Sequence, residues 1–437
     1  MNDFSIKESL SKPPFQAVIL AAGESSRFWP LSKKHKSLLR IAGKPLLYWT
    51  IRNLSESGVE DIIIVTGPGT AIKEEFAEGK DLGVKISYAI QEKPLGTGNA
   101  LFQAKSLIKE PFILLHPVKF YIKEIIKQFR EEAGSADAEA FLVAAPTDNP
   151  KDYGVLEFSE GKIVKIREDP LPGEEPSSLR TLGIYFLTPR FFEYYAKVDA
   201  SKEDSLIGAL NLIIKEKKAG AITLEKDPST VKYPWNALEV IDRFLKSDLF
   251  VPKICQTAKI GKNVVINGEI YIGENTIIGD NTVINGPCFI GDNCQIGPSN
   301  VLNGPLDLEA EVVTRAFTEI KHSLVGKGTH IHSGYFGNAV IGENCRFGAG
   351  FVSANRRFDR QNVFSTVKGK SLDTKTTFFS FAVGDNTKFG IHVSTLPGVL
   401  IGSNCAIGPH SLVRENIEDN TLFYAVFNET KKKRAVE

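Results

Sequence analysis

The sequence predicts two domains of different fold class, an α/β domain in the first half of the chain and a triangular parallel β-helix in the second. The first prediction comes from continuous apolar runs that alternate with helical stretches, and the second from aliphatic residues that recur every six positions. The chain has 437 residues, 42% of them hydrophobic, which is enough for two or three domains and too long for one undivided core.

The apolar runs of the first half are typical of parallel strands that are covered by helices on both sides, because they are continuous instead of alternating with polar residues. We expect strands at Ala17–Ala22, Asp61–Thr66, Val84–Ile90 and Phe112–Leu115, and helices at Leu46–Ser57 and Gly98–Ile108. Ligands of such sheets bind beyond the carboxyl ends of the strands, so we expect a site at that edge.

The second half contains a six-residue repeat. Nine aliphatic residues stand six apart: Ile260, Ile266, Ile272, Ile278, Ile284, Ile290, Ile296, Leu302 and Leu308. The register then slips and resumes at Val325, Ile331, Ile341, Phe347, Val383, Phe389, Thr395, Ile401, Ile407 and Val413. This period fits a triangular coil of three short strands, with the aliphatic residue inside and Gly or Asn at the tight corner. Every eighteenth residue should then stack.

These patterns divide the chain into four parts: an N-terminal extension at 1–14, the α/β domain at 15–250, the β-helix at 251–427 and a basic tail at 428–437. Pro234–Leu245 has helical spacing of apolar residues and is expected to connect the domains. Ser353–Ala382 interrupts the repeat, which predicts a loop that leaves the β-helix, and such loops often carry function.

Composition excludes several classes of protein. Lys and Arg number 53 and Asp and Glu 52, a net charge of +1, which argues against a nucleic-acid or membrane-surface binder. No long apolar run or signal peptide is seen. The five cysteines form no CxxC pair and are expected to be buried, reduced thiols, so we expect a cytoplasmic protein.

The segment that follows the first expected strand is suited to phosphate. It reads LAAGESSRFWPLSKKHKSLLRIAGKP from Leu20 to Pro45. Small residues at Ala21, Ala22 and Gly23 let backbone N–H groups approach an anion, and Arg27 and Lys36 can neutralise a triphosphate. The string resembles the signature of the nucleotide-diphospho-sugar pyrophosphorylases, LAAGxGTRxxPLTxxxPKxLLxIxGKP. The resemblance implies a Rossmann-like nucleotidyltransferase domain in which Arg27 and Lys36 are the catalytic cations and Ala21–Gly23 bind the nucleotide.

Two later segments support this resemblance. Gln91–Ala100 reads QEKPLGTGNA and is similar to the segment by which uridylyltransferases read a pyrimidine. It implies that the Gln91 amide offers both a donor and an acceptor to uracil or thymine of UTP or dTTP, and that Gly96 and Thr97 line the base. Further on, Gly154 and Glu168 resemble sugar contacts; Asp169 stands where the family has Lys, and Thr181 where it has Asn.

The chain also departs from the family pattern. Ser25 replaces a glycine, which puts the geometry of the loop in question. After Phe112–Leu115 the family places an aspartate that binds Mg²⁺, whereas this chain has His116-Pro117. Asn236 resembles the family's second metal position. Three interpretations of this domain are therefore kept: a slow enzyme, an enzyme whose metal ligand lies elsewhere in the sequence, and a site that has lost its activity.

A second motif lies in the β-helix. Lys321–Asn338 reads KHSLVGKGTHIHSGYFGN and resembles a segment of glucosamine-1-phosphate acetyltransferases. The resemblance implies that His332 is the general base and that Lys321 and Tyr335 contact the sugar phosphate, with Asn338 in place of the family's Asp. Imidazole suits this task because its unperturbed pKa lies near neutrality. His322 and His330 are interpreted as ordinary outward residues.

A neighbouring segment extends this resemblance. Phe347–Asp359 implies that Asn355 is a further sugar contact, while Arg346 and Phe378 replace an Asn and a Lys of relatives.

Over residues 15–426 the chain thus resembles the bifunctional N-acetylglucosamine-1-phosphate uridylyltransferase/glucosamine-1-phosphate acetyltransferases and their archaeal counterparts. The resemblance implies a left-handed β-helix, Mg²⁺ as cofactor, a sugar 1-phosphate and acetyl-CoA as substrates, and a homotrimer. Two alternatives remain: a catalytically impaired nucleotide-sugar-binding or regulatory homologue, and a single-activity nucleotidylyltransferase whose β-helix only trimerises.

Overall fold

The structure is a computed structural model that describes residues 16–31, 35–119, 121–132, 138–168, 170–199, 202, 204–226, 228, 231–428 and 430–431. The predicted extension at 1–14, Asp169 and most of the basic tail lie outside these residues. The chain forms two compact units. The first contains residues up to Glu24, Ser37–Leu39 and Lys44–Thr230, and the second contains Ser25–Lys36, Arg40–Gly43 and everything from Val231.

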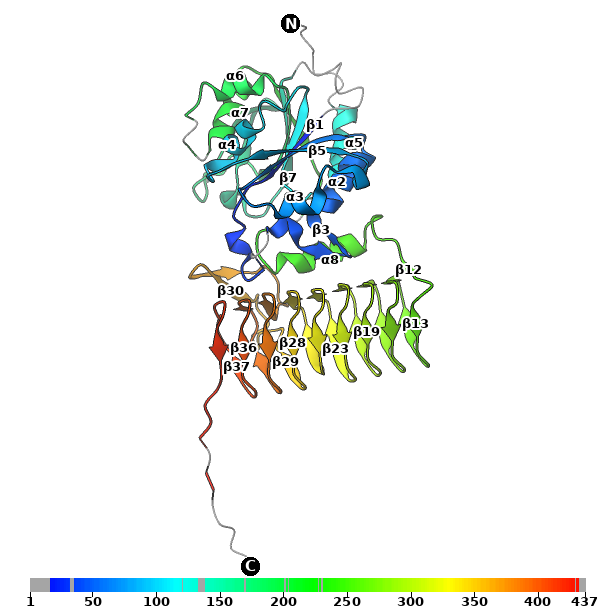
Figure 1. Ribbon diagram of the computed structural model, residues 1–437. Helices are drawn as coiled ribbons and strands as arrows, with labels where there is room; N and C mark the ends of the chain where they lie inside the picture. The colour runs from blue at the N-terminus through cyan, green and yellow to red at the C-terminus, as the bar shows by residue number, and fades with distance from the viewer. Residues whose placement is uncertain are drawn as a thin grey trace, which may run out of the picture. The chain divides into compact units, whose positions relative to one another are not determined.

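The first unit is built on a nine-stranded, mostly parallel sheet (Figure 1). Its strands are β1 (Gln16–Ala21), β4 (Asp61–Thr66), β5 (Lys85–Ile90), β6 (Phe112–Leu115), β7 (Ala140–Pro146), β8 (Val155–Ser159), β9 (Lys162–Arg167), β10 (Leu179–Leu187) and β11 (Ala219–Thr223). The order along the sheet is β11-β7-β10-β6-β1-β4-β5, with β8 and β9 attached to β10. β10 runs antiparallel to β6 and β7. The predicted parallel sheet is therefore confirmed around β1, whereas the pairs of β8 with β10 and β9 are antiparallel like those of β10 with β6 and β7.

Helices cover both faces of this sheet. They are α2 (Leu46–Glu56), α3 (Ala71–Phe76), α4 (Gly96–Gln103), α5 (Ile122–Glu132), α6 (Phe191–Tyr195) and α7 (Ser205–Lys215). Side chains of α2, α3 and α5 pack with Ile19, Ile62 and Ile64 on one face, and those of α4, α6 and α7 pack with Val18 and Ile63 on the other. This two-sided burial explains why the strands read as continuous apolar runs.

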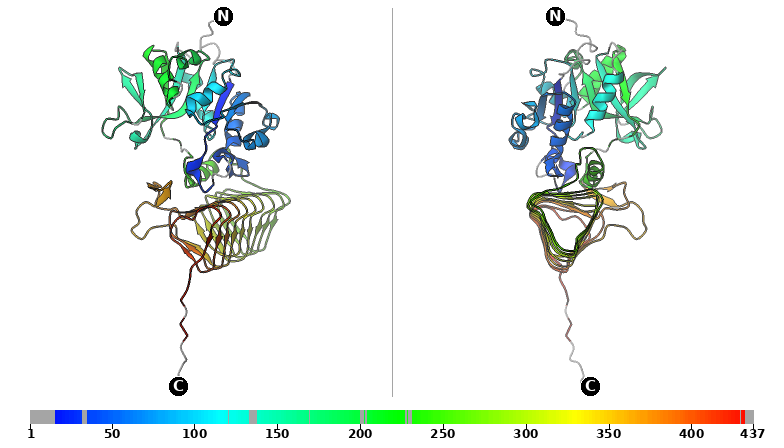
Figure 2. Two further views of the ribbon diagram at one scale, coloured as in Figure 1. Left: turned by 60° about the vertical axis from the view of Figure 1, so that its left-hand side comes forward. Right: turned by 90° about the vertical axis from the view of Figure 1, so that its right-hand side faces the viewer.

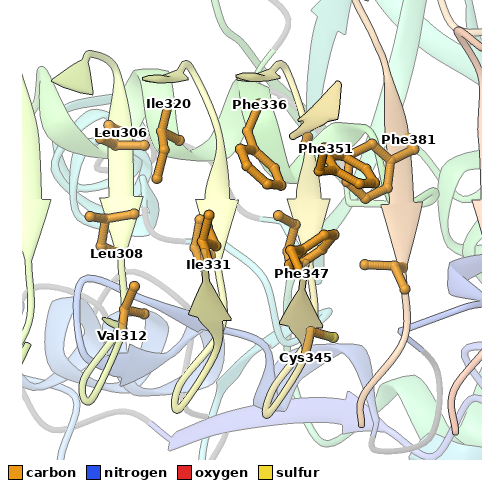
Figure 3. Packing of buried hydrophobic residues seen from close by; sticks show 14 of the residues in the cluster. Leu306, Leu308, Val312, Ile320, Ile331, Phe336, Cys345, Phe347, Phe351 and Phe381 are labelled. Carbon is orange, nitrogen blue, oxygen red and sulfur yellow. The ribbon is translucent and has the colours of Figure 1, made fainter. Parts of the chain in front are cut away.

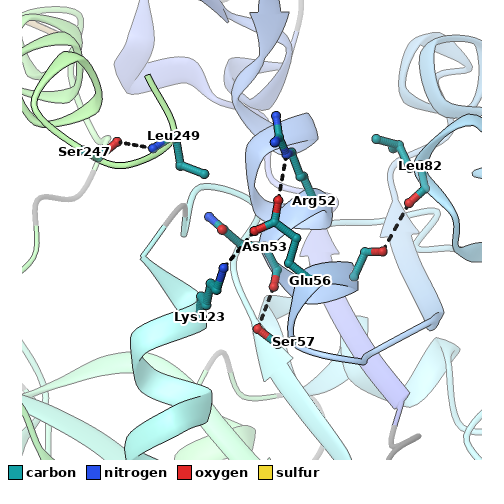
Figure 4. Close-up of polar contacts among 9 residues, drawn as sticks. Arg52, Asn53, Glu56, Ser57, Leu82, Lys123, Ser247 and Leu249 are labelled. Atoms are coloured by element: carbon teal, nitrogen blue, oxygen red, sulfur yellow. Dashed lines mark hydrogen bonds and ion pairs between the residues drawn. The ribbon is translucent and has the colours of Figure 1, made fainter. Parts of the chain in front are cut away.

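The predicted helix at Leu46–Ser57 matches α2 closely. The prediction of Gly98–Ile108 was only partly right, because α4 begins two residues earlier and ends at Gln103, after which the chain makes turns. Glu56, at the end of α2, accepts from Arg52 in the same helix (2.9 Å) and from Lys123 of α5 (2.9 Å), which joins two neighbouring helices (Figure 4). Its paired cations lower the pKa of the Glu56 carboxyl.

The second unit is a left-handed parallel β-helix with three faces, and its triangular section is visible end-on in Figure 2. The first face contains β12 (Lys253–Ile254), β15 (Ile270–Ile272), β18 (Cys288–Ile290), β21 (Leu306–Leu308), β24 (Leu324–Val325), β27 (Val340–Ile341), β32 (Phe381–Val383) and β35 (Val399–Ile401). The second contains β13 (Lys259–Ile260), β16 (Ile277–Ile278), β19 (Gln295–Ile296), β22 (Val313–Thr314), β25 (His330–Ile331), β28 (Arg346–Phe347), β33 (Lys388–Phe389), β36 (Ala406–Ile407) and β38 (Leu422–Phe423). The third contains β14 (Val265–Asn267), β17 (Val283–Asn285), β20 (Val301–Asn303), β23 (Thr318–Lys321), β26 (Gly334–Gly337), β29 (Phe351–Ser353), β34 (Ser394–Thr395) and β37 (Leu412–Val413).

The predicted stacking is confirmed in the early coils, where Ile290 pairs with Leu308, 18 residues later. The coil then shortens, since Leu308 pairs with Val325 and Val325 with Ile341. The inward residues are buried as predicted, and the phenylalanines Phe336, Phe347, Phe351 and Phe381 fill the interior next to the interruption (Figure 3). Ile260, which is 41% exposed, and Ile266, which is partly buried, differ because they belong to the first coil and are covered from one side only.

Glycine and asparagine have separate roles at the corners. Asn263, Asn275, Asn281, Asn293, Asn344, Asn386, Asn404 and Asn420 take the left-handed conformation, and several form amide ladders from one coil to the next. Gly273 and Gly279 do not have positive φ; a Cβ on either would lie 2.6 Å from the backbone of the next coil. Glycine is therefore needed here for close stacking of coils, and asparagine makes the turn.

Two predicted irregular segments are also found. α8 (Asn236–Leu245) matches the expected helix that precedes the β-helix. The excursion after β29 contains the antiparallel hairpin of β30 (Phe364–Val367) and β31 (Lys370–Asp373), and the chain rejoins the β-helix at β32. All five cysteines are free and buried, as predicted. No helix among the described residues is long and apolar enough to cross a membrane.

Candidate functional site

The carboxyl edge of the parallel strands brings three predicted positions to one side of the first unit. β1 ends at Ala21, which is in register with Thr66 at the end of β4, and Thr66 is in register with Ile90 of β5. Gln91 follows β5 directly, so the glycine loop and Gln91 lie at the same edge. Gly23 is exposed, and a Cβ built on it meets nothing within 4 Å. The space beside this backbone is open to a ligand.

Gln91 is buried and its amide nitrogen is committed within the loop. Nε2 donates to the carbonyl of Gly96 (3.0 Å) and to Oδ1 of Asn99 (3.0 Å). Both amide hydrogens are thus used, so this conformation offers a base only the acceptor Oε1. We expected Gln91 to supply both a donor and an acceptor to the base. In this conformation it supplies only the acceptor, so the donor must come from another group.

The two glycines of the LGTG segment serve different purposes. Gly96 begins α4 with φ 90°, a conformation that favours glycine, and is followed by half-buried Thr97. Gly98 is buried, and a Cβ there would collide with the Ser205 hydroxyl and lie 2.8 Å from the Leu206 nitrogen. Gly98 therefore allows α4 to pack against α7, while Gly96 shapes the loop at the candidate base site.

Gly154 and Glu168, predicted as sugar contacts, are brought together. A Cβ on Gly154 would collide with the Glu168 carboxylate, so the carboxylate packs against the glycine backbone. The Gly154 carbonyl accepts from the Thr181 nitrogen (2.8 Å). Burial, then the Glu168 charge, raises the pKa of Tyr185, whose hydroxyl interacts with Thr181. The result is a compact polar cluster that offers both acceptor and hydroxyl groups.

The position expected to bind Mg²⁺ does not fit a divalent cation. After β6, exposed His116 lies beside Gly183, where a Cβ would be 2.9 Å from the imidazole Cδ2. The Pro117 carbonyl accepts from the Thr50 hydroxyl (3.0 Å). Lys119 is buried, with Nζ donating to the Leu182 carbonyl (2.9 Å) and the Tyr121 hydroxyl (3.0 Å). A buried ammonium here has the wrong charge for a metal ligand set.

Asn236, the second predicted metal position, uses its oxygen to start α8. Its Oδ1 accepts from the backbone nitrogens of Lys232 (3.1 Å) and Tyr233 (2.8 Å). The described residues contain no group of three or more His, Cys, Asp or Glu that could hold a metal. The donor set at the two predicted positions is therefore unsuited to Mg²⁺ in this structure.

The predicted catalytic cations lie in the second unit, together with a third cation. Lys36 Nζ donates to the Val231 carbonyl (2.9 Å), and its backbone nitrogen donates to the Ser25 hydroxyl (3.1 Å). Burial, then Arg27 and Lys232, lower the pKa of Lys36. Ser25 has a left-handed backbone with φ 53°, a conformation that glycine adopts without strain. Lys36, Arg27 and Lys232 thus bring three positive charges close together.

The predicted sugar contacts of the β-helix form one hydrogen-bonded group on the third face. Asn355 Nδ2 donates to the Tyr335 hydroxyl (3.3 Å) and to Asn338 Oδ1 (2.8 Å). Both side chains lean over Gly337, where a Cβ would lie 2.5 Å from the Tyr335 hydroxyl and 2.8 Å from Asn355 Nδ2. Lys321 is exposed on the adjacent strand, in register with Gly337. Glycine at 337 is therefore required by the polar group above it.

His332 lies at the corner between β25 and β26. Its side chain is exposed, and its backbone nitrogen donates to the Phe347 carbonyl (3.0 Å). His330 precedes it on the second face, where burial, Arg346 and Arg315 lower the pKa of the imidazole. Burial, then the Glu319 charge, raises the pKa of Tyr335, which stays a neutral donor. His332 thus lies three residues from the polar group, with its imidazole accessible.

Sequence analysis missed three polar residues. Lys232 acts on Lys36 from a distant part of the chain, and no spacing in the sequence indicates this. Tyr185 belongs to the polar cluster of Glu168 and Thr181 in the first unit. His322 was interpreted as an ordinary outward histidine, yet its Nδ1 accepts from Asn338 Nδ2 (3.1 Å). A signal was available for the last one, because 322 and 338 occupy the same corner in successive short coils.

Comparison with known proteins agrees with both motifs. Residues 16–229 match the nucleotidyl transferase family, and residues 252–286 match the bacterial transferase hexapeptide (six repeats) family. The chain is 38% identical over 416 residues to a bifunctional protein GlmU of Methanococcus maripaludis strain C7, covering 93% of this chain and 97% of that protein. It is 35% identical over 418 residues to a bifunctional protein GlmU of Methanocaldococcus jannaschii, with the same coverage.

A third relative has a more explicit description. The chain is 32% identical over 419 residues to a bifunctional sugar-1-phosphate nucleotidylyltransferase/acetyltransferase of Sulfurisphaera tokodaii, covering 93% of this chain and 99% of that protein. Likeness at this level extends through both units and not merely through one domain. The chain therefore belongs to the family of bifunctional GlmU enzymes, with a nucleotidyltransferase domain followed by a hexapeptide-repeat acetyltransferase domain.

Proposed function

We propose that the protein makes a UDP- or dTDP-sugar from a sugar 1-phosphate in its first domain and acetylates an amino-sugar 1-phosphate with acetyl-CoA on its β-helix. The observation that carries this proposal is the polar group of Tyr335, Asn338 and Asn355 beside exposed Lys321 and His332. Such a group combines an anion partner, neutral hydrogen-bonding groups and a base, which are the needs of an amino-sugar phosphate undergoing acyl transfer.

In the nucleotidyl step, an oxygen of the sugar phosphate attacks the α-phosphorus of the nucleotide. A new P–O bond forms, the bond to the β-phosphate breaks, and pyrophosphate leaves. Arg27 and Lys36 neutralise the charge that develops on the phosphates, and Lys232 adds a third positive charge near Lys36. Ala21, Ala22 and Gly23 offer backbone N–H groups, Gln91 offers Oε1 to the base, and Gly154 and Glu168 bind the sugar.

Magnesium would supply further charge neutralisation if it accompanies the nucleotide. Neither His116-Pro117 nor the engaged oxygen of Asn236 suits it, so the proposal routes no step through a metal held by this chain. The prediction of a magnesium requirement can be tested by titrating EDTA and Mg²⁺ into the pyrophosphate assay.

In the acetyl step, the neutral amine nitrogen attacks the carbonyl carbon of acetyl-CoA. A C–N bond forms, the C–S bond breaks and CoA leaves as a thiolate, while His332 accepts the proton that the amine loses. The protonated His332 then returns this proton to the thiolate, which gives free CoA thiol and regenerates the base. Lys321 pairs with the sugar phosphate, and Tyr335 and Asn355 hold the sugar. An exposed imidazole at the corner is accessible to both reactants.

We also propose a homotrimer in the cytoplasm. The outer surface of the β-helix carries exposed apolar side chains, among them Val265 and Val352 on the third face and Ile277 on the second, and flat faces of this kind are suited to packing around a threefold axis. Light scattering should give the mass of three 48.1-kDa chains, and a monomer would contradict the assembly.

His116-Pro117 and buried Lys119 favour one rival, in which the first domain binds nucleotide sugar without making it. Purified protein is therefore incubated with UTP or dTTP and a panel of sugar 1-phosphates, with pyrophosphate measured, and separately with acetyl-CoA and amino-sugar 1-phosphates, with free thiol measured. Both products support the proposal. Thiol release without pyrophosphate supports the rival, and pyrophosphate without thiol supports a β-helix that only assembles the protein.

A further inference from the structure

Three successive coils of the β-helix place polar side chains at one corner, after the third face. His322 follows β23, Asn338 follows β26, and Asn355 follows β29. His322 and Asn338 both have positive φ, 42° and 55°, and each starts a coil that is shorter than 18 residues. Their side chains therefore stack along the axis of the β-helix and form a hydrogen-bonded chain that ends at Tyr335.

At its other end, the hydrogen-bonded series of side chains meets the Leu238 carbonyl, which can only accept a hydrogen bond. His322 Nε2 lies 3.4 Å from the carbonyl oxygen of Leu238 in α8. A carbonyl oxygen has no proton to give, so Nε2 must carry the proton of the neutral imidazole, and Nδ1 must be the acceptor. Burial lowers the pKa of His322, which keeps the ring neutral.

This tautomer of His322 determines which group donates and which accepts in each hydrogen bond from Asn338 to Tyr335. Nδ1 accepts from Asn338 Nδ2 (3.1 Å), so Asn338 must turn its Oδ1 toward Asn355, which donates with Nδ2 (2.8 Å). Asn355 Nδ2 also donates to the Tyr335 hydroxyl (3.3 Å). Asn355 therefore presents Oδ1 as its acceptor, and Tyr335 presents its hydroxyl hydrogen as a donor.

We propose that His322 is a positioning residue that sets the hydrogen-bonding polarity of Asn355 and Tyr335 toward the amino sugar, and that its protonation reverses this polarity. The proposal rests on the proposed acetyl-transfer site. An acceptor at Asn355 Oδ1 suits an N–H or O–H of the sugar, and a donor at Tyr335 suits a sugar oxygen. Neither His322 nor Asn338 needs to touch the substrate.

The reversal follows from counting protons. A doubly protonated imidazole donates from both nitrogens, so Asn338 must turn its oxygen to His322 and its nitrogen to Asn355, and Asn355 must then turn as well. The charged groups that face His322 are Asp242 and Lys246 of α8 and Lys321 of β23. Burial lowers the pKa of the ring most, the Leu238 carbonyl and Asp242 raise it, and the two lysines lower it further, so the change is expected in acid.

The same logic gives a meaning to Asn338, where the motif described above has Asp. A carboxylate has no hydrogen to donate, so it accepts from Asn355 Nδ2 whether or not His322 is protonated, and so holds Asn355 in the binding orientation. With an amide at this position the orientation depends on His322. His322 and Asn338 thus act together to set the orientation of Asn355.

The test uses three variants of the full-length protein, and the probe is glucosamine 1-phosphate. His322→Gln keeps a donor for Leu238 and an acceptor for Asn338 but does not titrate; Asn338→Asp fixes the polarity; His322→Phe keeps the bulk and removes both bonds. Binding without acetyl-CoA is measured by calorimetry from pH 5 to 8, and KM and kcat for sugar and for acetyl-CoA are measured alongside.

We expect His322→Phe to weaken sugar binding and raise its KM by roughly tenfold at pH 8, the scale of one lost hydrogen bond, with KM for acetyl-CoA unchanged. Wild type should lose affinity in acid more steeply than His322→Gln and Asn338→Asp. Because all four proteins meet the same substrate, its own ionisation cancels in this comparison.

Equal affinities of wild type and His322→Phe would overturn the proposal, and so would identical pH profiles of wild type and both polarity-keeping variants. If His322→Phe does not fold, the comparison of wild type with His322→Gln and Asn338→Asp still decides. Wild type that acetylates the sugar but shows no difference among variants overturns only this inference, whereas wild type that neither binds nor acetylates it at any pH overturns the proposed function as well.

Discussion

Lys36 illustrates how single residues in this chain tolerate unfavourable surroundings. It is largely buried, its pKa is lowered by burial and by two neighbouring cations, and its ammonium donates only to a neutral carbonyl among the bonds described. Positive charges that are kept close together in this way are stabilised when an anion binds between them. A bound triphosphate is therefore expected to stabilise the cluster of Lys36, Arg27 and Lys232 by offsetting the repulsion among their charges.

The first prediction concerns Arg27. Arg27→Ala should lower the rate of pyrophosphate release by roughly 10²–10³, the scale for losing one preorganised charge, while the rate of thiol release from acetyl-CoA stays unchanged. Lys127→Ala, which removes an exposed positive charge from α5, is the matched control and should leave both rates unchanged. Unchanged pyrophosphate release by Arg27→Ala would remove Arg27 from the mechanism.

The motif residues could be predicted from the sequence, but the structural role of each one could not. The segment Gln91–Ala100 indicated a base site, yet only the structure separates Gly96, which needs positive φ, from Gly98, which makes room for α7. Similarly, Ser25 was an apparent defect until its left-handed backbone and its bond to Lys36 were seen. Such duties depend on atoms that are distant in the sequence.

A second prediction at this scale concerns two buried carboxyls of the β-helix. Asp307 Oδ2 accepts from the Ala42 nitrogen (2.7 Å), and Glu309 Oε1 accepts from the Gly43 nitrogen (2.9 Å). Burial and the Glu309 charge raise the pKa of Asp307, and burial raises the pKa of Glu309 to about 7. Backbone donors and the Arg40 charge oppose this rise at Glu309.

The direction of the pH dependence of stability follows from the number of protons bound in the folded and unfolded states. Between about pH 4.3, where an unfolded Glu titrates, and pH 7, the folded state holds more protons than the unfolded state, so its stability falls as pH rises through this window. Hydrogen exchange at Ala42 and Gly43, corrected for the intrinsic rate, should show less protection at pH 8 than at pH 5. Glu309→Gln should weaken this dependence, and Glu415→Gln, at an exposed site, should not. A flat profile in wild type would contradict the account.

At the scale of elements, the β-helix depends on how closely its coils approach. Glycines such as Gly273 sit where the next coil leaves no room for a Cβ, and the asparagines turn the corners. The repeat made this element predictable in detail, including the interruption at Ser353–Ala382. The α/β domain was less so, because β10 pairs antiparallel with two strands from elsewhere in the chain and no local pattern records that pairing.

The third prediction tests the close approach of coils. Gly273→Ala should lower the free energy of unfolding by about 1–3 kcal/mol, because the new methyl group would lie 2.6 Å from backbone atoms of Gly291 and Asp292. Gly69→Ala, which meets nothing within 4 Å and has no positive φ, is the control. Urea unfolding followed by circular dichroism measures both. Equal midpoints for the two variants would show that the coils can separate without cost.

At the scale of the whole molecule, the chain joins a nucleotidyltransferase domain and a hexapeptide-repeat acetyltransferase domain. We propose that the cations and the base loop serve the nucleotidyl step, and that the polar group of the third face with His332 serves the acyl step. His116-Pro117 and Asn338 lie in different units, so we expect each of these departures to affect one step only. The sequence could indicate both activities, because each motif is local, but it could not show that Asn338 is supported by His322 from another coil.

The central claim is that one chain carries two separate transferase sites, and the most direct test measures both products in Arg27→Ala and His332→Ala. We expect His332→Ala to release no CoA thiol with glucosamine 1-phosphate and acetyl-CoA, while it releases pyrophosphate from UTP at the wild-type rate; Arg27→Ala should show the opposite pattern. Loss of both activities in either variant would contradict the separation of the sites, and undiminished thiol release by His332→Ala would contradict the assignment of the base.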